Sequence, residues 1–303
     1  MKTFDIIIIG GGPSGMTAAL YALRAGRSVL VIEQSTFGGQ ISSSPRVENY
    51  PSIKEISGVE FSDNLYEQIT ALGAEFDLAK VKEIKKIDNS FYITTVYDDE
   101  YKSNVAIIAN GVVHRKTGVK DEEKFIGKGI SYCATCDGVF YKGEEVLLIG
   151  DANTALQYAL LLSTYCKKVT ICTLFDKFFG DNELVERIKN KNNIAYFHNL
   201  ELQEFIHNES EVTGAIFFDK VSKNMKSFSS AAIFVAIGQI PSNDLFKNYV
   251  DLDHGYIETN ENMETKTPGL YATGDTRVKK VRQLITACSD GAIAAINAEK
   301  YLS

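Results

Sequence analysis

The sequence predicts an α/β protein with two Rossmann-like dinucleotide-binding folds, the second inserted into the first. Two observations support this fold class. A glycine-rich turn follows an apolar strand near the N-terminus and recurs in altered form at Gly150. A short strand followed by Gly274-Asp275, near the C-terminus, completes the first fold from the far end of the chain. The middle of the chain is therefore expected to form the second fold.

Composition restricts the classes of function. The chain has 303 residues, 45% of them apolar, and a formal charge of −7, which argues against a nucleic-acid ligand. No apolar run approaches the roughly 20 residues of a membrane helix. The apolar run at residues 6–9 is ended by glycines and indicates a buried strand instead of a signal peptide. We expect a cytoplasmic protein that binds neither nucleic acid nor a membrane.

The N-terminal segment has the pattern of a dinucleotide-binding turn. Residues 4–9 are apolar apart from Asp5, and the sequence Gly10-Gly11-Gly12-Pro13-Ser14-Gly15 leads into a predicted helix. Gly10 allows a tight turn, Gly12 lets a pyrophosphate approach the backbone, and Gly15 lets helix and strand pack closely. A second predicted strand, residues 28–32, ends in Glu33, whose carboxylate can accept hydrogen bonds from a ribose diol.

A C-x-x-C pair lies in the middle of the chain. Cys133 and Cys136 are followed at once by Asp137. A zinc site would need a second ligand pair, but the other three cysteines are isolated and the four histidines show no ligand spacing, so no metal is expected. Two structural thiols would leave the adjacent carboxylate unexplained. A redox disulfide fits best, because this short loop can open and close with little backbone movement.

Several motifs together resemble one family. The segments GGGPSG, FGGQI, VENYP, CATCDG, FVAIGQIPSNDLF and GDTR…RQLITACSDG occur in the order found in low-molecular-weight thioredoxin reductases, over nearly the whole chain. The resemblance implies FAD as cofactor, thioredoxin as partner and a homodimer. It implies that Cys136 exchanges electrons with the flavin, that Cys133 attacks the thioredoxin disulfide, and that Asp137 is the acid/base of thiol release.

The same resemblance implies domain limits and an FAD site. The FAD domain would comprise residues 1–113 and 243–303, with a small antiparallel layer at 81–87, 91–96 and 105–109, and residues 114–242 would form the three-layer ββα insert. Asn110 stands where the family usually has Thr. The residues expected to bind FAD are Gly10, Gly12, Pro13, Ser14, Gly15, Glu33, Gly38, Gln40, Asn49, Val81, Asn110, Gly111, Gly274, Asp275, Arg282 and Gln283.

The second glycine turn is altered where a nicotinamide cofactor would bind. Ala152 replaces the second glycine, and Asp151 places a carboxylate near the expected phosphates. NADPH-dependent members of the family carry His-Arg-Arg and a further Arg after the next strand. At the corresponding positions this sequence has Thr173, Leu174, Phe175 and Phe179. Loss of three charge-assisted arginine contacts would weaken binding of the 2′-phosphate by a factor of about a thousand or more.

We therefore expect reduced ferredoxin as electron donor. Reduced deazaflavin and weakly bound NADPH are alternatives, as is a dithiol oxidase that passes electrons to oxygen. A further alternative is a non-catalytic flavin-binding scaffold or redox sensor. The CATCDG segment argues against this alternative. Ferredoxins are acidic, so docking would need a local basic patch, for which Lys279, Lys280, Arg282 and the pair Lys167–Lys168 are candidates without assignment.

Overall fold

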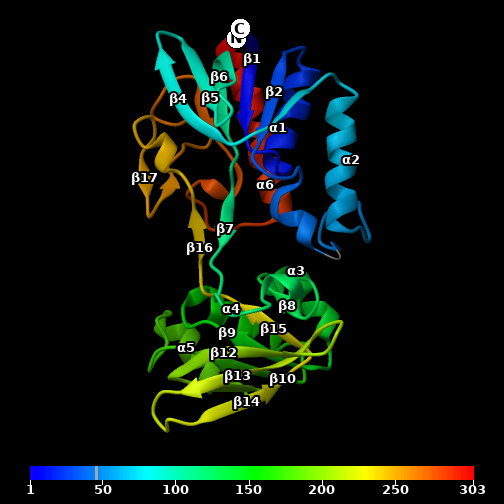
Figure 1. Ribbon diagram of the computed structural model, residues 1–303, viewed down its shortest axis with the longest axis vertical. Helices are drawn as coiled ribbons and strands as arrows, with labels where there is room; N and C mark the ends of the chain where they lie inside the picture. The colour runs from blue at the N-terminus through cyan, green and yellow to red at the C-terminus, as the bar shows by residue number, and fades with distance from the viewer. Residues whose placement is uncertain (45–46) are drawn as a thin grey trace. The chain divides into compact units, whose positions relative to one another are not determined.

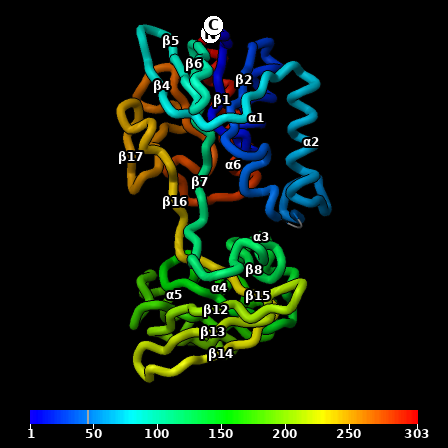
Figure 2. The backbone as a smooth tube through the Cα atoms, in the orientation of Figure 1, coloured from blue at the N-terminus to red at the C-terminus, as the bar shows by residue number. Residues whose placement is uncertain are grey.

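The computed structural model describes residues 1–44 and 47–303 and divides them into two compact units (Figure 1). Unit 1 comprises Met1–Val113 and Ile240–Ser303, and unit 2 comprises His114–Gln239. The second boundary therefore lies three residues before the one expected from the sequence. The strands β7 (Val112–His114) and β16 (Gln239–Pro241) carry the chain between the units and pair side by side (Figure 2).

Unit 1 is built on a seven-stranded sheet in the order β3-β2-β1-β6-β5-β4, with β19 also paired to β6. β1 pairs in parallel with β2 and β6, as expected of a doubly wound fold. The strands are β1 (Lys2–Ile9), β2 (Val29–Glu33), β3 (Glu75–Leu78), β4 (Val81–Ile87), β5 (Ser90–Thr95), β6 (Glu100–Ile108) and β19 (Leu270–Ala272).

One strand serves both layers of unit 1. The expectation that residues 105–109 belong to the antiparallel layer is wrong. β6 is nine residues long, so its first half pairs antiparallel with β5 while residues 105–108 pair in parallel with β1. β6 also pairs in parallel with β19 from the C-terminal segment. The same strand thus joins the two ends of the chain to the antiparallel layer.

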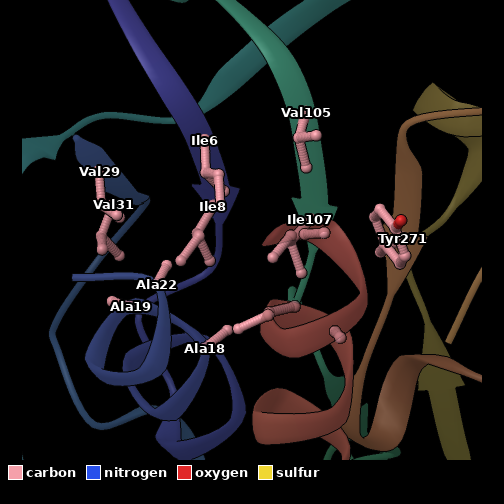
Figure 3. Close-up of a cluster of buried hydrophobic side chains, with 14 of the residues drawn as sticks. Ile6, Ile8, Ala18, Ala19, Ala22, Val29, Val31, Val105, Ile107 and Tyr271 are labelled. Carbon is pink, nitrogen blue, oxygen red and sulfur yellow. The ribbon is translucent and has the colours of Figure 1, made fainter. Parts of the chain in front are cut away.

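Helices cover the sheet of unit 1 through small side chains. Isoleucines and valines of β1, β2 and β6 point toward Ala18, Ala19 and Ala22 of α1 (Figure 3). Alternate residues, such as Ile7 and Ile9, pack in a second cluster on the other face, so these strands are buried on both sides. The longer helices are α1 (Pro13–Arg24), α2 (Gly58–Thr70) and α6 (Leu284–Leu302). Shorter elements are η1 (Gly39–Ser43), η4 (Asp244–Phe246), η5 (Gly274–Thr276), β17 (Leu252–Asp253) and β18 (Tyr256–Ile257).

Unit 2 has the three layers of a ββα fold. A parallel five-stranded sheet in the order β11-β10-β9-β15-β8 lies between helices and the antiparallel sheet β12-β13-β14. Val146 and Leu148 pack with α4, and Leu147 and Ile149 pack with side chains of the antiparallel sheet. The strands are β8 (Ile130–Ser131), β9 (Glu145–Ile149), β10 (Lys168–Cys172), β11 (Ile194–Phe197), β12 (Leu200–His207), β13 (Val212–Asp219), β14 (Met225–Ser229) and β15 (Ala232–Val235). The helical segments are η2 (Glu123–Phe125), α3 (Ala134–Asp137), η3 (Gly138–Tyr141), α4 (Asn153–Leu162) and α5 (Asn182–Lys189).

These layers confirm the predicted fold class of two Rossmann-like folds, one inserted in the other. Within the described ranges, no helix combines the length and the apolar character needed to cross a bilayer.

The contact between α1 and α6 depends on Gly291. A Cβ atom at this position would lie 2.1 Å from the carbonyl oxygen of Ser14, a backbone atom that cannot easily move.

Replacing Gly291 tests this contact. Alanine stabilises a helix by about 1 kcal/mol relative to glycine, but overpacking a tight contact costs about 1–3 kcal/mol. We expect Gly291→Ala to lose roughly 2 kcal/mol of unfolding free energy, measured by urea unfolding followed by circular dichroism. Ser289→Ala, at an exposed position of the same helix, is the control, and equal stability of the two variants would contradict this account.

Candidate active site

The first glycine turn has the geometry of a phosphate cradle. Gly10 has φ +114°, and a Cβ there would lie 2.3 Å from the carbonyl oxygen of Ala109. A Cβ at Gly15 would lie 2.0 Å from the carbonyl oxygen of Gly10. Gly12 precedes α1, and no described atom comes within 4 Å of a Cβ built there. Packing therefore requires glycine at positions 10 and 15. Gly12 instead leaves open space beside the N-terminus of the helix, where an anion is stabilised.

Glu33 supports this turn from the end of β2. The carboxylate is 8% exposed, and its Oε2 accepts a hydrogen bond of 2.7 Å from the backbone N–H of Gly11. Oε1 accepts hydrogen bonds from the N–H and hydroxyl of Ser35. Each carboxylate oxygen can accept more than one hydrogen bond, so Glu33 can hold the turn and still receive a ribose hydroxyl.

The C-terminal motif meets the glycine turn directly. Ser14 Oγ and Thr273 Oγ1 are 2.8 Å apart, and Gly274, with φ +78°, could not carry a Cβ without approaching Ser14 within 2.8 Å. Asp275 follows, and its Oδ1 is buried without a hydrogen-bond partner among the residues described. Burial raises the pKa of Asp275, while the nearby charges of Lys279 and Arg282 oppose that shift. Asp275 is half-buried, and its Oδ1, without a hydrogen-bond partner beside the open phosphate cradle, is an acceptor for ligand hydroxyl groups.

Asp290 holds the loop that carries Asp275. It is 4% exposed, and Arg277 binds both of its oxygens, at 2.8 and 2.9 Å. Lys279 Nζ lies 2.8 Å from the same carboxylate and 3.8 Å from Asp275. Burial alone would raise the pKa of Asp290, but the hydrogen bonds from Arg277 and Lys279 outweigh it and hold the pKa below its usual value. Sequence reasoning missed this cluster, whose only signal was an acidic residue within the RQLITACSDG motif.

Lys279 is therefore excluded as a docking residue. Its side chain is only 7% exposed and is engaged in the pairs described above. The Arg282 guanidinium lies over the ring of Tyr256, 4.2 Å from its centroid, and Lys167 pairs with Glu145 at 2.9 Å. Of the basic residues considered from sequence, Lys167, Lys168 and Lys280 are exposed.

Other predicted cofactor residues line the same turn. Gly38 donates its N–H to the carbonyl of Gly11, and a Cβ on Gly39 would lie 3.3 Å from Gly12 Cα, so the FGGQ segment touches the cradle. Gln40 Nε2 donates to the carbonyl of Val112. At the start of α6, Gln283 forms a capping box with Thr286 and accepts a hydrogen bond of 3.4 Å from Asn49.

Asn110, Gly111 and Val81 complete the predicted set. Asn110 Nδ2 donates to the carbonyl of Ser242 at 2.8 Å, and its Oδ1 is buried with no hydrogen-bond partner in the described chain. Gly111 has φ +62° and open space where a Cβ would point. Val81 begins β4 and packs in the core cluster that contains Ile32. Asn110 thus has an acceptor oxygen without a hydrogen-bond partner among the described residues, and its role at the cofactor stays a prediction.

In unit 2, Cys133 and Cys136 form a disulfide at the start of α3, with their Cα atoms 5.3 Å apart. Both residues are partly exposed. The backbone N–H of Cys136 donates to Cys133 Sγ at 3.2 Å. A hydrogen bond of this kind stabilises a thiolate at Cys133 when the pair is reduced.

Asp137 is partly buried and lies directly after this disulfide in the chain. Its Oδ2 accepts a hydrogen bond of 2.6 Å from Ser131, and its Oδ1 is buried without a described partner. Burial raises the pKa of Asp137, and the Ser131 hydrogen bond opposes part of the shift. A carboxyl whose pKa is moved toward neutrality can hold a proton and release it to a neighbouring sulfur.

The second glycine turn differs from the first in its residues and contacts. Ala152 is the residue before α4, and Asp151, whose pKa is raised by burial, accepts the Phe179 N–H at its backbone carbonyl. Thr173 is fully buried and hydrogen-bonded to His198. The neighbouring Leu174, Phe175 and Phe179 are 43%, 48% and 55% exposed. An exposed apolar surface therefore follows β10, at the positions where the sequence comparison expects arginines in NADPH-dependent members of the family.

The remaining thiols and the histidines do not form a metal centre. Cys166, Cys172 and Cys288 are buried and unpaired, and burial raises the pKa values of Cys166 and Cys172 to about 11 and about 12. Among the residues that the structure covers, no group of three or more His, Cys, Asp or Glu is arranged to hold an ion. These thiols are small buried hydrophobic groups.

Two dinucleotide folds, one with a phosphate cradle and one with a disulfide beside a buried carboxyl, define a disulfide oxidoreductase. Comparisons agree with this class: the family described as pyridine nucleotide-disulphide oxidoreductase matches residues 4–291. The chain is 38% identical to thioredoxin reductase of Bacillus subtilis (strain 168) over 99% of this chain and 95% of the relative. It is 37% identical to a "34.2 kDa protein in rubredoxin operon" of Clostridium pasteurianum, covering 99% and 98%. The crystal structure of thioredoxin reductase from Streptococcus pyogenes MGAS5005 superposes with a TM-score of 0.94 at 33% identity, covering 99% and 98%.

The chain belongs to the low-molecular-weight thioredoxin reductase family. The predicted family resemblance is confirmed, and membership implies FAD as cofactor. The narrower expectation, a ferredoxin-dependent branch, has no support from these relatives. Their descriptions name no ferredoxin, and the family description names a pyridine nucleotide.

Proposed function

We propose that this protein reduces thioredoxin with electrons from reduced ferredoxin. The observation that carries the reductase assignment is the Cys133–Cys136 disulfide with the buried carboxyl of Asp137 beside it. Relatives named thioredoxin reductase cover nearly the whole chain and support thioredoxin as the acceptor.

The cradle in unit 1 fits FAD. Gly12 leaves open space at the start of α1, and Asp275 and Asn110 each present a buried acceptor oxygen without a described partner. We assign the pyrophosphate to the Gly10–Gly15 turn, a ribose to Glu33 and a ribityl hydroxyl to Asp275, with the other predicted residues around them. When bound, FAD supplies the redox chemistry that links the electron donor to the disulfide.

The dithiol then performs two exchange steps. The Cys133 thiolate, stabilised by the Cys136 N–H, attacks one sulfur of the thioredoxin disulfide, so that bond breaks and a mixed disulfide forms. The Cys136 thiolate next attacks Cys133 Sγ, which restores the Cys133–Cys136 disulfide and releases thioredoxin as a dithiol. Each sulfur that leaves as a thiolate needs a proton, and Asp137 is placed to supply one.

The donor assignment is supported by the surface after β10. Phe175 and Phe179 pack edge to face, with ring centroids 5.3 Å apart, and Lys177 and Lys220 lie over these two rings. At the start of α4, the Asp181 carboxylate accepts a hydrogen bond from Asn153 and adds negative charge. Two nearby carboxylates, Asp151 and Asp181, oppose NADPH, whereas Lys177 and Lys220 are the cations at this surface that could meet its phosphate. NADPH remains the second candidate, because the family description names a pyridine nucleotide.

A homodimer is part of this proposal. The helices of unit 1 expose Tyr21, Ile285, Ile296 and Tyr301. Tyr21 and Ile285 also line a cavity of about 480 Å³, together with Tyr50, Phe61 and other mostly apolar residues. Exposed apolar surface of this kind supports burial against a second copy. Sedimentation of the holoprotein at the mass of one chain would contradict it.

The exchange mechanism predicts separate effects on the flavin and on thioredoxin. In Cys133→Ser, reduced ferredoxin should still bleach the flavin absorbance, because the FAD site is intact. Thioredoxin turnover should fall to background, because the thiolate that attacks thioredoxin is lost and Cys136 alone cannot complete the exchange. The control, Cys166→Ala, removes a buried thiol that the mechanism does not use and should keep activity. Full thioredoxin turnover by Cys133→Ser would contradict the assignment.

The FAD site predicts a loss of affinity without a loss of fold. Asp275→Asn keeps the side-chain size but replaces a charged acceptor, and hydrogen bonds to charged groups are worth about 10–100-fold in affinity. We expect FAD to bind more weakly by that factor, measured by quenching of flavin fluorescence on adding flavin-free protein. Asp63→Asn, on the exposed surface of α2, should bind as the parent does. Unchanged affinity in Asp275→Asn would exclude Asp275 as a ligand of FAD.

A further inference from the structure

Ser131 lies between the redox disulfide and the buried carboxyl. It ends β8, is 5% exposed, and pairs through its backbone with Phe234 of β15. Its hydroxyl oxygen accepts a hydrogen bond of 3.0 Å from the N–H of Cys133 and donates one of 2.6 Å to Asp137 Oδ2. One hydroxyl thus touches both the first cysteine of the C-x-x-C pair and the proposed acid.

A second acceptor is within reach of the same hydroxyl. The backbone carbonyl oxygen of Cys133 lies 3.4 Å from Ser131 Oγ. When Asp137 is ionised, the hydroxyl donates to Oδ2. When Asp137 is protonated at Oδ2, the carboxyl donates to Ser131 Oγ, and the hydroxyl hydrogen can turn to the Cys133 carbonyl. A serine oxygen has one hydrogen and two lone pairs, so it also keeps the hydrogen bond from the Cys133 N–H in both arrangements.

We propose that Ser131 is a positioning residue for dithiol exchange, a rotatable hydroxyl that pairs with Asp137 in either protonation state and ties it to the Cys133 backbone. This inference rests on the proposed acid/base role of Asp137. Without the hydroxyl, both carboxyl oxygens of Asp137 would lack a described partner, because Oδ1 has none already. Leaving a buried polar group unpaired is costly, and the charged form suffers more than the neutral one.

The groups around Asp137 determine whether removing the Ser131 hydroxyl raises or lowers the pKa of Asp137. Tyr141 and Tyr158 have pKa values raised first by their own burial and then by the charge of Asp137, so both lie within electrostatic range of it. Both are neutral near pH 7 and add no charge of their own. The Ser131 hydrogen bond lowers the pKa of Asp137 against the larger effect of burial. Removing the hydroxyl therefore raises the pKa of Asp137 further.

The test is a titration of the Asp137 carboxyl in the oxidised holoenzyme. The infrared C=O band of the protonated carboxyl, identified by its loss in Asp137→Asn, is followed against pH. We expect Ser131→Ala to move the midpoint upward by about one pH unit. Ser131→Thr, which keeps a hydroxyl, should titrate as the parent does. Ser163→Ala removes a buried hydroxyl that bonds only within α4 and should also leave the midpoint unchanged.

Turnover supplies a second readout. Ser131→Ala should lower kcat for thioredoxin and leave KM unchanged, because the serine holds the proton donor and not the partner. An unmoved midpoint in Ser131→Ala would overturn the inference, as would an equal shift in Ser163→Ala. If Ser131→Ala does not fold, Ser131→Gly removes the same hydroxyl and carries the same test. Wild-type turnover by Asp137→Asn would instead overturn the proposed acid/base role, whatever Ser131 does.

Discussion

The structure of unit 1 depends on the close approach of the two ends of the chain at Ser14. Only glycine fits at positions 274 and 291, because a Cβ atom at either position would collide with Ser14. This contact lets α6 pack on α1 and sets Asp275 beside the phosphate cradle. It also explains why a second fold can be inserted in the middle of the chain. The sheet is completed by β19 from the far end, which pairs in register with β6.

Burial of carboxyl groups is the second recurring constraint. Asp137 and Asp275 both have raised pKa values, and burial is the largest cause in each case. Their surroundings nevertheless differ. Asp275 faces the cation Lys279, which keeps it an acceptor, whereas Asp137 is paired with a neutral hydroxyl, which lets it take up a proton. The same physical effect therefore suits one carboxyl to holding a ligand and the other to moving a proton.

The fold class and the main motifs of the site could be predicted from the sequence, because local requirements of the backbone determine them. The Gly10–Gly15 turn, Cys133 and Cys136 are short motifs whose geometry is encoded by neighbouring residues, and the fold class followed from their order. Asp290 was not predicted, because its partners Arg277 and Lys279 matter only once the loop turns back on α6. The double pairing of β6 was missed for a similar reason: an apolar run shows that a strand is buried but not which strands flank it.

The second dinucleotide fold poses the remaining functional question. Its β-strands and α4 are retained, yet Leu174, Phe175 and Phe179 form an exposed apolar surface at the positions where arginines are expected in NADPH-dependent members of the family. The most direct measurement is an anaerobic titration of the holoprotein, first with NADPH and NADH and then with reduced ferredoxin, following the flavin absorbance. This account predicts that the flavin stays oxidised with either nicotinamide and is bleached by ferredoxin. Stoichiometric bleaching by NADPH would contradict it and identify a nicotinamide-dependent reductase.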